Sequence, residues 1–413
     1  MKANTNEIYV LTELAKQVLE ASRRPENEEK RRLWIALREL KAKRPMILAE
    51  AETVLWIAIQ SELKCEDEYL RGIETNLRMR LEHQEIGDDF VMGSTLEIPW
   101  DIHISSYGVP VSMVRPEGPS MGYVYNFPIQ GEKDAGKLIK REFTVDREKS
   151  LKHKAFLEEV LGGIMEVSLT AGPCMHTGLT SPLFSLIGME NMLFWMYDEP
   201  DLLNYLISYL CDDKGRYFKW LEDENLLALN NDNHLVASGS PGFTSELPKA
   251  HVGNDKQGAG KVQLSDLWCF TESQETLDVS PEKYEEFVLP YLVRLSDLFG
   301  FTYYGCCEPV SDRLDKIKAA FGNLRSVSVS GWCDKEAAAE MLGDAYVYSN
   351  KPMPAYMSGT SPDWEGKKKE VESVLNPARK HNCQLEFILR DVYDIGGDSK
   401  RFAKWADMMR AMI

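Results

Sequence analysis

The stretch Leu298–Phe321, LFGFTYYGCCEPVSDRLDKIKAAF, predicts a strand, a sharp turn and a helix in close succession. The aromatic run ends at Tyr304, Gly305 permits the change of direction, and Ser311 is a candidate N-cap for a helix over Asp312–Ala320. In an α/β protein the residues between a parallel strand and its helix lie at the carboxyl end of the sheet, where ligands and catalytic groups collect. Three reactive side chains therefore lie where chemistry is expected: Cys306, Cys307 and Glu308.

The paired cysteines have two readings. Free cysteine is among the most buried residue types, so a single thiol often only fills space in a core. Neighbours on a strand, however, point to opposite faces, so Cys306 and Cys307 cannot both enter one core. Cys306 is the first candidate for a thiol that faces a site, while Cys307 faces away or lies in the turn.

Apolar runs alternate with helical patterns along most of the chain. Eight predicted strands separated by helices indicate a (β/α)8 TIM barrel over residues 44–413, with residues 1–43 as an N-terminal helical extension and loop insertions that include residues 107–145. One strand ends at Tyr304, and the other seven are Met46–Ala49, Asp89–Met92, Ile164–Leu169, Leu226–Asn230, Leu324–Ser330, Ala345–Ser349 and Leu385–Leu389.

Polar and aromatic side chains follow several of these strands. Glu97 and Trp100 suit a pocket wall, because the indole can stack on a flat substrate while the carboxylate takes or gives a proton; the alternative is an exposed loop. Asp232 can hold a substrate amine or hydroxyl, or orient His234, although turn chemistry alone also explains an aspartate there. Glu97, Asp232 and His234 are therefore predicted catalytic residues.

The aromatic residues at strand ends form a second group of candidates. Trp332 follows the predicted strand Leu324–Ser330, and Tyr304 ends the strand before the two cysteines. Together with Trp100 they are predicted to contact the substrate.

Composition restricts the class of partner. The formal net charge of −17 and the pI near 5.0 repel phosphate backbones and anionic lipid, which argues against nucleic acid and membrane surfaces. Eight cysteines scattered through 413 residues form no disulfide framework, and the chain has neither a signal segment nor a run of 18 apolar residues. We expect a cytoplasmic, reduced protein with a small-molecule substrate.

Two segments resemble the uroporphyrinogen decarboxylase superfamily. Asp266–Trp268 is similar to a D-S-W segment of that superfamily, and Ser280–Leu292, SPEKYEEFVLPYL, is similar to its S-P-E-x-F-x-E-F-V-L-P-Y helix. The order of the following motifs, GCCEP, SVSVSGWCD and YSNKPMP, is also similar, and the likeness is strongest over Asp266–Pro354. The resemblance implies a barrel preceded by helices.

The superfamily contains tetrapyrrole decarboxylases and corrinoid-linked methyltransferases. The decarboxylases bind their polycarboxylate substrate through an R-Q-A-G-R segment, where this chain reads RPMILAEAETVLW, although Glu97 falls where they have a catalytic aspartate. The methyltransferases bind zinc through His-x-Cys on strand five and a cysteine after strand eight. Cys306 matches the first cysteine, Tyr304 stands at the histidine, and the strand-eight segment Leu389–Val392 has no cysteine. The resemblance implies a zinc site from Cys306 and nearby substitutes: Cys307, Glu308, Cys333 and Asp391.

The predicted function is that of a corrinoid-linked methyltransferase, which moves a methyl group between a methyl-corrinoid and a small acceptor at the barrel mouth, with zinc as cofactor and a corrinoid protein as partner. One alternative is a metal-free decarboxylase, a lyase, with Glu97 as acid and base. The other is a non-catalytic protein that binds a corrinoid or tetrapyrrole.

Overall fold

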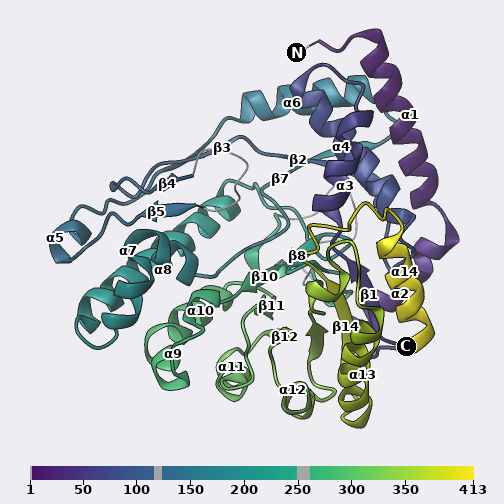
Figure 1. Cartoon of the computed structure of the whole chain (residues 1–413). Coiled ribbons are helices and arrows are strands. Elements are labelled where there is room, and N and C mark those ends of the chain that lie inside the picture. The colour runs from purple at the N-terminus through teal and green to yellow at the C-terminus, as the bar shows by residue number, and fades with distance from the viewer. Residues whose placement is uncertain (1, 116–122, 249–260) are drawn as a thin grey trace.

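The largest sheet of the protein is parallel and has six strands in the order β1-β14-β13-β12-β11-β10 (Figure 1). The computed structural model describes residues 2–115, 123–248 and 261–413, so part of the predicted insertion at residues 107–145 lies outside the described residues. The strands are β1 (Met46–Ala49), β10 (Trp268–Thr271), β11 (Phe301–Tyr304), β12 (Leu324–Val329), β13 (Val347–Asn350) and β14 (Gln384–Leu389).

Shorter ladders surround this sheet. The pair β2 (Thr95–Pro99) and β7 (Glu166–Thr170) is parallel. Three ladders are antiparallel: β3 (Ile102–Ile104) with β6 (Phe143–Val145), β4 (Ser112–Val114) with β5 (Val124–Asn126), and β8 (Leu235–Ala237) with β9 (Ser240–Pro241). The ladders of the described residues do not run continuously around a closed barrel, so what they establish is a mixed α/β fold with a six-stranded parallel sheet.

Helices connect the strands and cover the sheet from outside (Figure 1). The first half of the chain contains α1 (Thr5–Ser22), α2 (Pro25–Arg38), α3 (Glu52–Ile59), α4 (Glu68–Gln84), α5 (Glu132–Ala135), α6 (Arg147–Val160), α7 (Thr180–Phe194) and α8 (Pro200–Asp223). The second half contains α9 (Pro281–Phe287), α10 (Leu289–Ser296), α11 (Leu314–Ala320), α12 (Lys335–Leu342), α13 (Trp364–Lys380) and α14 (Arg401–Met412). None of the helices in the described ranges has the length and apolar character needed to cross a bilayer.

Local chemistry explains where the helices around β11 begin and end. The Ser280 hydroxyl accepts a hydrogen bond from the Lys283 N–H at 3.3 Å, and Pro281 occupies the first turn of α9. The helical backbone is interrupted at Val288, between α9 and α10, and Pro290 belongs to the first turn of α10. The Ser311 hydroxyl does not cap α11; it accepts a hydrogen bond from the Asp334 N–H at 2.9 Å.

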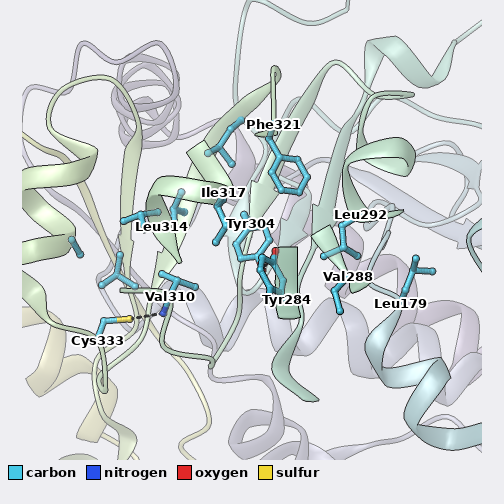
Figure 2. Close-up of a cluster of buried hydrophobic side chains, with 14 of the residues drawn as sticks. Leu179, Tyr284, Val288, Leu292, Tyr304, Val310, Leu314, Ile317, Phe321 and Cys333 are labelled. Atoms are coloured by element: carbon cyan, nitrogen blue, oxygen red, sulfur yellow. Dashed lines mark hydrogen bonds between the residues drawn. The ribbon is translucent and has the colours of Figure 1, made fainter. Parts of the chain in front are cut away.

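The outer side of β11 packs into an apolar layer beneath α9, α10 and α11 (Figure 2). Tyr304 lies here, completely buried, with its ring 5.6 Å from that of Phe321 and its hydroxyl 2.8 Å from the hydroxyl of Tyr284. Residues of α11 complete the layer: Leu314 and Ile317. Burial of this surface supplies the hydrophobic free energy that holds the helices on the sheet.

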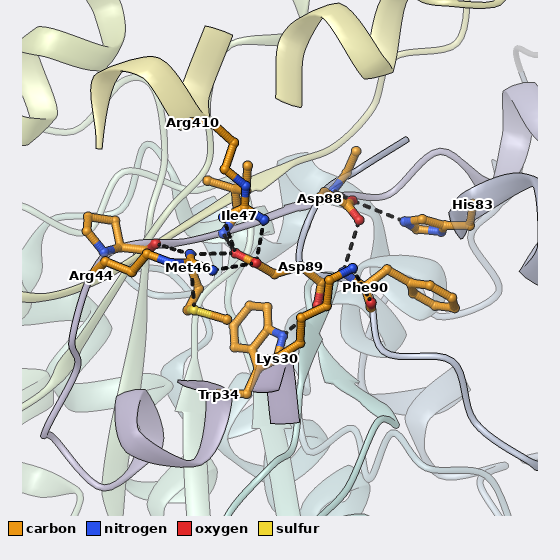
Figure 3. A network of polar contacts seen from close by, with 12 residues as sticks. Lys30, Trp34, Arg44, Met46, Ile47, His83, Asp88, Asp89, Phe90 and Arg410 are labelled. Atoms are coloured by element: carbon orange, nitrogen blue, oxygen red, sulfur yellow. Dashed lines mark hydrogen bonds and ion pairs between the residues drawn. The ribbon is translucent and has the colours of Figure 1, made fainter. Parts of the chain in front are cut away.

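The β1 edge of the sheet is paired with side chains instead of a strand (Figure 3). The Asp89 N–H donates to the Ile47 carbonyl at 2.9 Å, but the N–H groups of Ile47 and Ala49 donate to the carboxylates of Asp89 and Asp88, both at 2.8 Å. The prediction of a strand over Asp89–Met92 is therefore wrong, because carboxylate oxygens take the positions of backbone carbonyls.

At the other edge of the sheet, the side chain of Asn230 forms hydrogen bonds to the backbone of β10. Its side-chain amide accepts from the Trp268 N–H at 2.9 Å and donates to the Trp268 carbonyl at 3.1 Å. The prediction of a strand over Leu226–Asn230 is wrong for this reason. The segment Thr95–Pro99, read as part of a loop, is strand β2, and the eight predicted strands did not include β10.

A buried polar chain fills the concave side of the sheet. The Arg38 guanidinium, from the end of α2, forms an ion pair with Glu386 on β14 at 2.8 Å, and both side chains are at most 1% exposed. The Ser240 hydroxyl, in the β8–β9 hairpin, donates to Glu386 at 2.7 Å and lies 3.4 Å from the Ser349 hydroxyl. Lys351 donates to the Ser349 hydroxyl at 3.0 Å. Hydrogen bonds thus link α2 to the loop that follows β13.

Removal of the Glu386 carboxylate should strongly destabilise the fold. Glu386→Ala leaves the Arg38 charge buried without its partner, and we expect it to lower the free energy of unfolding by about 3–5 kcal/mol. The measurement is equilibrium unfolding in urea.

Two further variants calibrate this loss. The double variant R38M/E386L, which removes both charges, should be more stable than Glu386→Ala alone. Glu148→Ala, which breaks an exposed ion pair with Lys152, should change the stability little. A Glu386→Ala protein as stable as Glu148→Ala would contradict the role given to the buried pair.

Candidate functional site

A cleft of about 430 Å³ opens at the carboxyl ends of β1, β10, β11 and β14. Its walls come from the loops after these strands, from the β8–β9 hairpin and from the segment before α7. The side chains that matter for its chemistry are Glu50, His176, Glu272, Glu275, Cys306 and Arg390. A cleft at this edge of a parallel sheet is the expected position of a small-molecule site.

Cys306 lines the cleft from the turn after β11. Gly305 allows this turn, since its φ of +91° lies in a region that other residues rarely adopt. The Cys306 sulfur is 3.7 Å from the sulfur of Cys307 and 3.4 Å from Nη1 of Arg390. The hydrogen bond from Cys307 lowers the pKa of the Cys306 thiol, the Arg390 charge adds to this effect, and burial opposes it. Cys306 is thus the thiol of the pair that ionises first.

Glu50 and Arg390 form an ion pair at the ends of the neighbouring strands β1 and β14. The guanidinium is shared between this carboxylate and the sulfur of Cys306. The β8–β9 turn passes close by at Gly239, where a β-carbon would lie 2.7 Å from Ile388 and 3.2 Å from a Glu50 oxygen. Because its φ is also +74°, this position requires glycine.

The opposite wall carries a second polar pair. Nε2 of His176 lies 3.1 Å from Oε1 of Glu272, the residue that follows β10. Burial alone would raise the pKa of Glu272, but the hydrogen bond to His176 and one from the Gln274 N–H hold it below its usual range. Gly178 leaves room for the pair, since a β-carbon there would lie 2.5 Å from the Glu272 oxygen.

Of the five residues predicted as metal ligands, Cys306, Cys307 and Asp391 lie in contact, with the two sulfurs 3.7 Å apart, whereas Glu308 and Cys333 lie elsewhere. The Cys307 sulfur is 3.8 Å from an Asp391 oxygen. The Glu308 carboxylate is buried and accepts from the N–H groups of Cys306 and Ser273, at 2.9 and 3.0 Å, and burial raises its pKa to about 7. Cys333 packs in the apolar layer, where its sulfur accepts from the Val310 N–H at 3.4 Å (Figure 2).

The five predicted donors therefore do not form one shared zinc site. In the described ranges, no group of three or more His, Cys, Asp or Glu side chains is arranged to hold a metal ion. Zinc sites use three or four protein ligands, and Glu308 and Cys333 are occupied as hydrogen-bond acceptors away from the contacts among Cys306, Cys307 and Asp391. The sequence had suggested that all five side chains meet at one place. In the structure the Glu308 carboxylate binds backbone N–H groups and the Cys333 sulfur lies in the apolar layer.

The predicted catalytic residues divide between two places. Oε1 of Glu97 on β2 is 2.5 Å from Nε2 of His234, so these two meet. Glu97 and Trp100 line a neighbouring cavity of about 420 Å³, and Arg147 lies over the indole with its guanidinium carbon 5.6 Å from the ring centroid. Asp232 does not orient His234; it forms an ion pair with Arg31 on α2.

The other predicted aromatic contacts lie away from the cleft. Trp332 is on the surface with 65% of its area exposed, and Tyr304 is buried under the helices. Since neighbours on a strand alternate in direction, the inward position belongs to Tyr303, whose hydroxyl donates to Ser349 at 2.7 Å.

Sequence reasoning gave no role to several residues that line the cleft. Glu50, Glu272 and Arg390 each follow directly after a strand, and this position is the signal that identifies them. His176 lies in the segment that follows β7, and its partner in the structure is Glu272.

The comparisons with known proteins leave the family open. No protein-family model matches the sequence, and no curated protein matches it. Among solved structures, a methyltransferase from Methanosarcina mazei is similar with a TM-score of 0.48 and 11% sequence identity, over 93% of this chain and 98% of that one. A likeness at this level carries no argument about function.

The environment of Cys306 makes a testable prediction about alkylation. The rate of its reaction with iodoacetamide should rise with pH at a midpoint below the value of about 8.5 for an ordinary cysteine, because the thiolate is the reactive form. In Cys307→Ala the hydrogen bond is lost, so the midpoint should move to higher pH and the reaction at neutral pH should slow. Mass spectrometry of the peptide that contains Cys306 measures both.

The control for this prediction is Cys383→Ala, which removes a thiol near the amino end of β14. It should leave the alkylation profile of Cys306 unchanged. Identical profiles for the wild type and Cys307→Ala would show that the neighbouring thiol does not stabilise the anion.

Proposed function

We propose that this chain is an enzyme that transfers a methyl group between a methyl-corrinoid and a small acceptor bound in the cleft. The observation that carries the proposal is the position of Cys306, which lines the cleft with its sulfur 3.4 Å from Arg390. The resemblance of Asp266–Pro354 to the uroporphyrinogen decarboxylase superfamily, whose methyltransferases have a thiol at this position of the sequence, supports it.

The residues of the cleft suggest how an acceptor would be activated. In its thiolate form, Cys306 would accept a proton from an acceptor S–H group. The acceptor sulfur would then form a bond to the methyl carbon while the methyl–cobalt bond breaks, and the electron pair of that bond would stay on the corrinoid. Arg390 keeps the sulfur anionic before this step, and Glu50 fixes the guanidinium in place. A methyl-corrinoid supplies an electrophilic methyl group when it is bound, and no zinc ion takes part.

We further propose that residues 44–413 form one (β/α)8 barrel and that residues 1–43 are a helical extension. Contacts at both edges of the six-stranded sheet support this ring. At the β1 edge the Asp89 N–H bonds to the Ile47 carbonyl, and at the β10 edge His176 forms a parallel bridge with Phe270. The parallel pair β2–β7 would close the gap between these edges.

Methyl transfer from methylcobalamin to a small thiol tests the proposed function. Loss of the methyl–cobalt absorbance, together with the S-methyl product by mass spectrometry, measures the rate. Cys306→Ala should lower this rate about 100-fold or more, the range expected when a general base is removed. Cys383→Ala, the same change outside the cleft, should leave it unchanged.

Two outcomes would count against this reaction. One is the absence of methylated product with the wild-type protein, and the other is an equal rate in Cys306→Ala. Stoichiometric zinc in freshly purified, reduced protein that disappears in Cys306→Ala would instead contradict the metal-free mechanism and restore the predicted metal site.

A second candidate function is supported by the 2.5 Å contact between Glu97 and His234. A carboxylate and an imidazole at this distance beside a cavity can exchange a proton with a substrate, as a metal-free decarboxylase requires. Release of carbon dioxide from a carboxylated aromatic or tetrapyrrole substrate, without corrinoid and abolished in Glu97→Gln, would favour this lyase.

A further inference from the structure

We infer that the cleft binds a small substrate with a positively charged ammonium group, which is recognised by Glu275 and Phe270. This inference rests on the proposed function in taking the cleft as the substrate site, and it adds the chemical class of the substrate. It is argued from the carboxylates, cations and aromatic rings that line the cleft, and from which of the charged groups already have partners.

The first step is the charge of each carboxylate in the cleft. Glu50 is neutralised by its ion pair with Arg390. Glu272 is held by His176 and by the Gln274 N–H. Both therefore already have partners in the structure.

Glu275 differs from these two. It lies in the short 3₁₀ helix Gln274–Thr276, and its Oε2 accepts from the Thr180 hydroxyl at 2.6 Å, a neutral donor. Across the described ranges no ion pair involves it, and burial raises the pKa of its carboxyl group. A carboxylate in a partly buried wall without a counter-charge is stabilised when a cation enters beside it.

The second step concerns cations. Arg390 is the one arginine or lysine among the described residues that line the cleft, and it is engaged by Glu50 and Cys306. Two lysines lie close behind the walls, with their ammonium groups turned to backbone carbonyls: Lys214 donates to Gly178 at 2.6 Å and Lys351 to Ser238 at 2.9 Å. An anionic substrate would thus meet no unengaged cation, whereas a cationic one would meet Glu275.

The third step is aromatic. Phe270 and His176 line the same wall with ring centroids 5.0 Å apart. The face of a phenyl ring attracts a cation, and aromatic rings are used to recognise quaternary ammonium groups. Phe270 supplies such a ring and Glu275 supplies a carboxylate in the lining of the same cleft.

The test compares choline with its uncharged isostere 3,3-dimethyl-1-butanol by calorimetric titration of the full chain. The two have the same shape, so burial of apolar surface favours both equally and only choline gains from the carboxylate. We expect choline to bind at least about tenfold more tightly than the alcohol. Methylammonium, as a second probe, shows whether a protonated amine suffices.

Matched variants identify the residues. Glu275→Gln keeps the size and the hydrogen bond to Thr180 but removes the charge, and it should weaken choline about tenfold while leaving the alcohol unchanged. Phe270→Leu keeps an apolar side chain and should weaken choline by a smaller factor. Glu190→Gln, an exposed acid on α7, is the control and should have no effect.

The inference is overturned if neither cation binds more tightly than the alcohol, or if Glu275→Gln retains the wild-type preference for choline. The methyl-transfer assay separates this failure from that of the proposed function. Cys306-dependent methyl transfer without charge-selective binding would retain the function and reject the ammonium substrate. Charge-selective binding that depends on Glu275, without methyl transfer, would do the reverse.

Discussion

The carboxylate of Asp89 joins parts of the chain that are far apart in sequence (Figure 3). It accepts hydrogen bonds from Arg44 before β1, from Arg410 on α14 and from the backbone of Ile47, while its own carbonyl accepts from the Trp34 indole at 2.8 Å. Burial alone would raise its pKa, but the two guanidinium groups hold it below the usual range. Both ends of the chain are thereby attached to the strand that carries Glu50 into the cleft.

At both edges of this sheet, polar side chains form hydrogen bonds to the backbone of the edge strand, as Asp89 does at β1. Edge strands present unpaired N–H and C=O groups, which must find partners when they are buried. At β1 the partners are the carboxylates of Asp88 and Asp89, and at β10 one partner is the Asn230 amide. These side chains satisfy the backbone without a further strand, and they leave the neighbouring segments free to turn into the walls of the cleft.

Much of the fold follows from the sequence because the strands are apolar runs bounded by turn residues. β1 has the predicted bounds, and the ends of β11 to β14 were predicted to within two residues. The two wrong strands, Asp89–Met92 and Leu226–Asn230, fail for one physical reason. A run of apolar residues does not reveal that an aspartate or asparagine side chain, and not the backbone, makes the pairing.

The candidate site could be predicted from the sequence only in part. The thiol of Cys306 was placed correctly at the end of a strand, because the turn at Gly305 is visible in the sequence. The predicted convergence of five donors does not occur, because closeness along the chain does not fix the direction of a side chain. Cys333 enters the apolar layer, and Glu308 binds backbone N–H groups. Contacts such as that of Glu50 with Arg390 join strands that are neighbours in the sheet but lie far apart in the sequence, so they have no local signature.

The chain of buried hydrogen bonds that begins at Arg38 connects α2 to the turn that precedes Cys306. From Arg38 it runs through Glu386, Ser240, Ser349 and Lys351 to the hairpin residue Ser238, whose hydroxyl donates to the Gly305 carbonyl at 3.3 Å, one residue before the reactive thiol. Contacts that begin on helix α2 therefore help to position the β8–β9 hairpin and the turn after β11, which both line the cleft. A protein without this helix would lose the start of the hydrogen-bonded chain that reaches Ser238 and the Gly305 carbonyl, although every residue that lines the cleft would still be present.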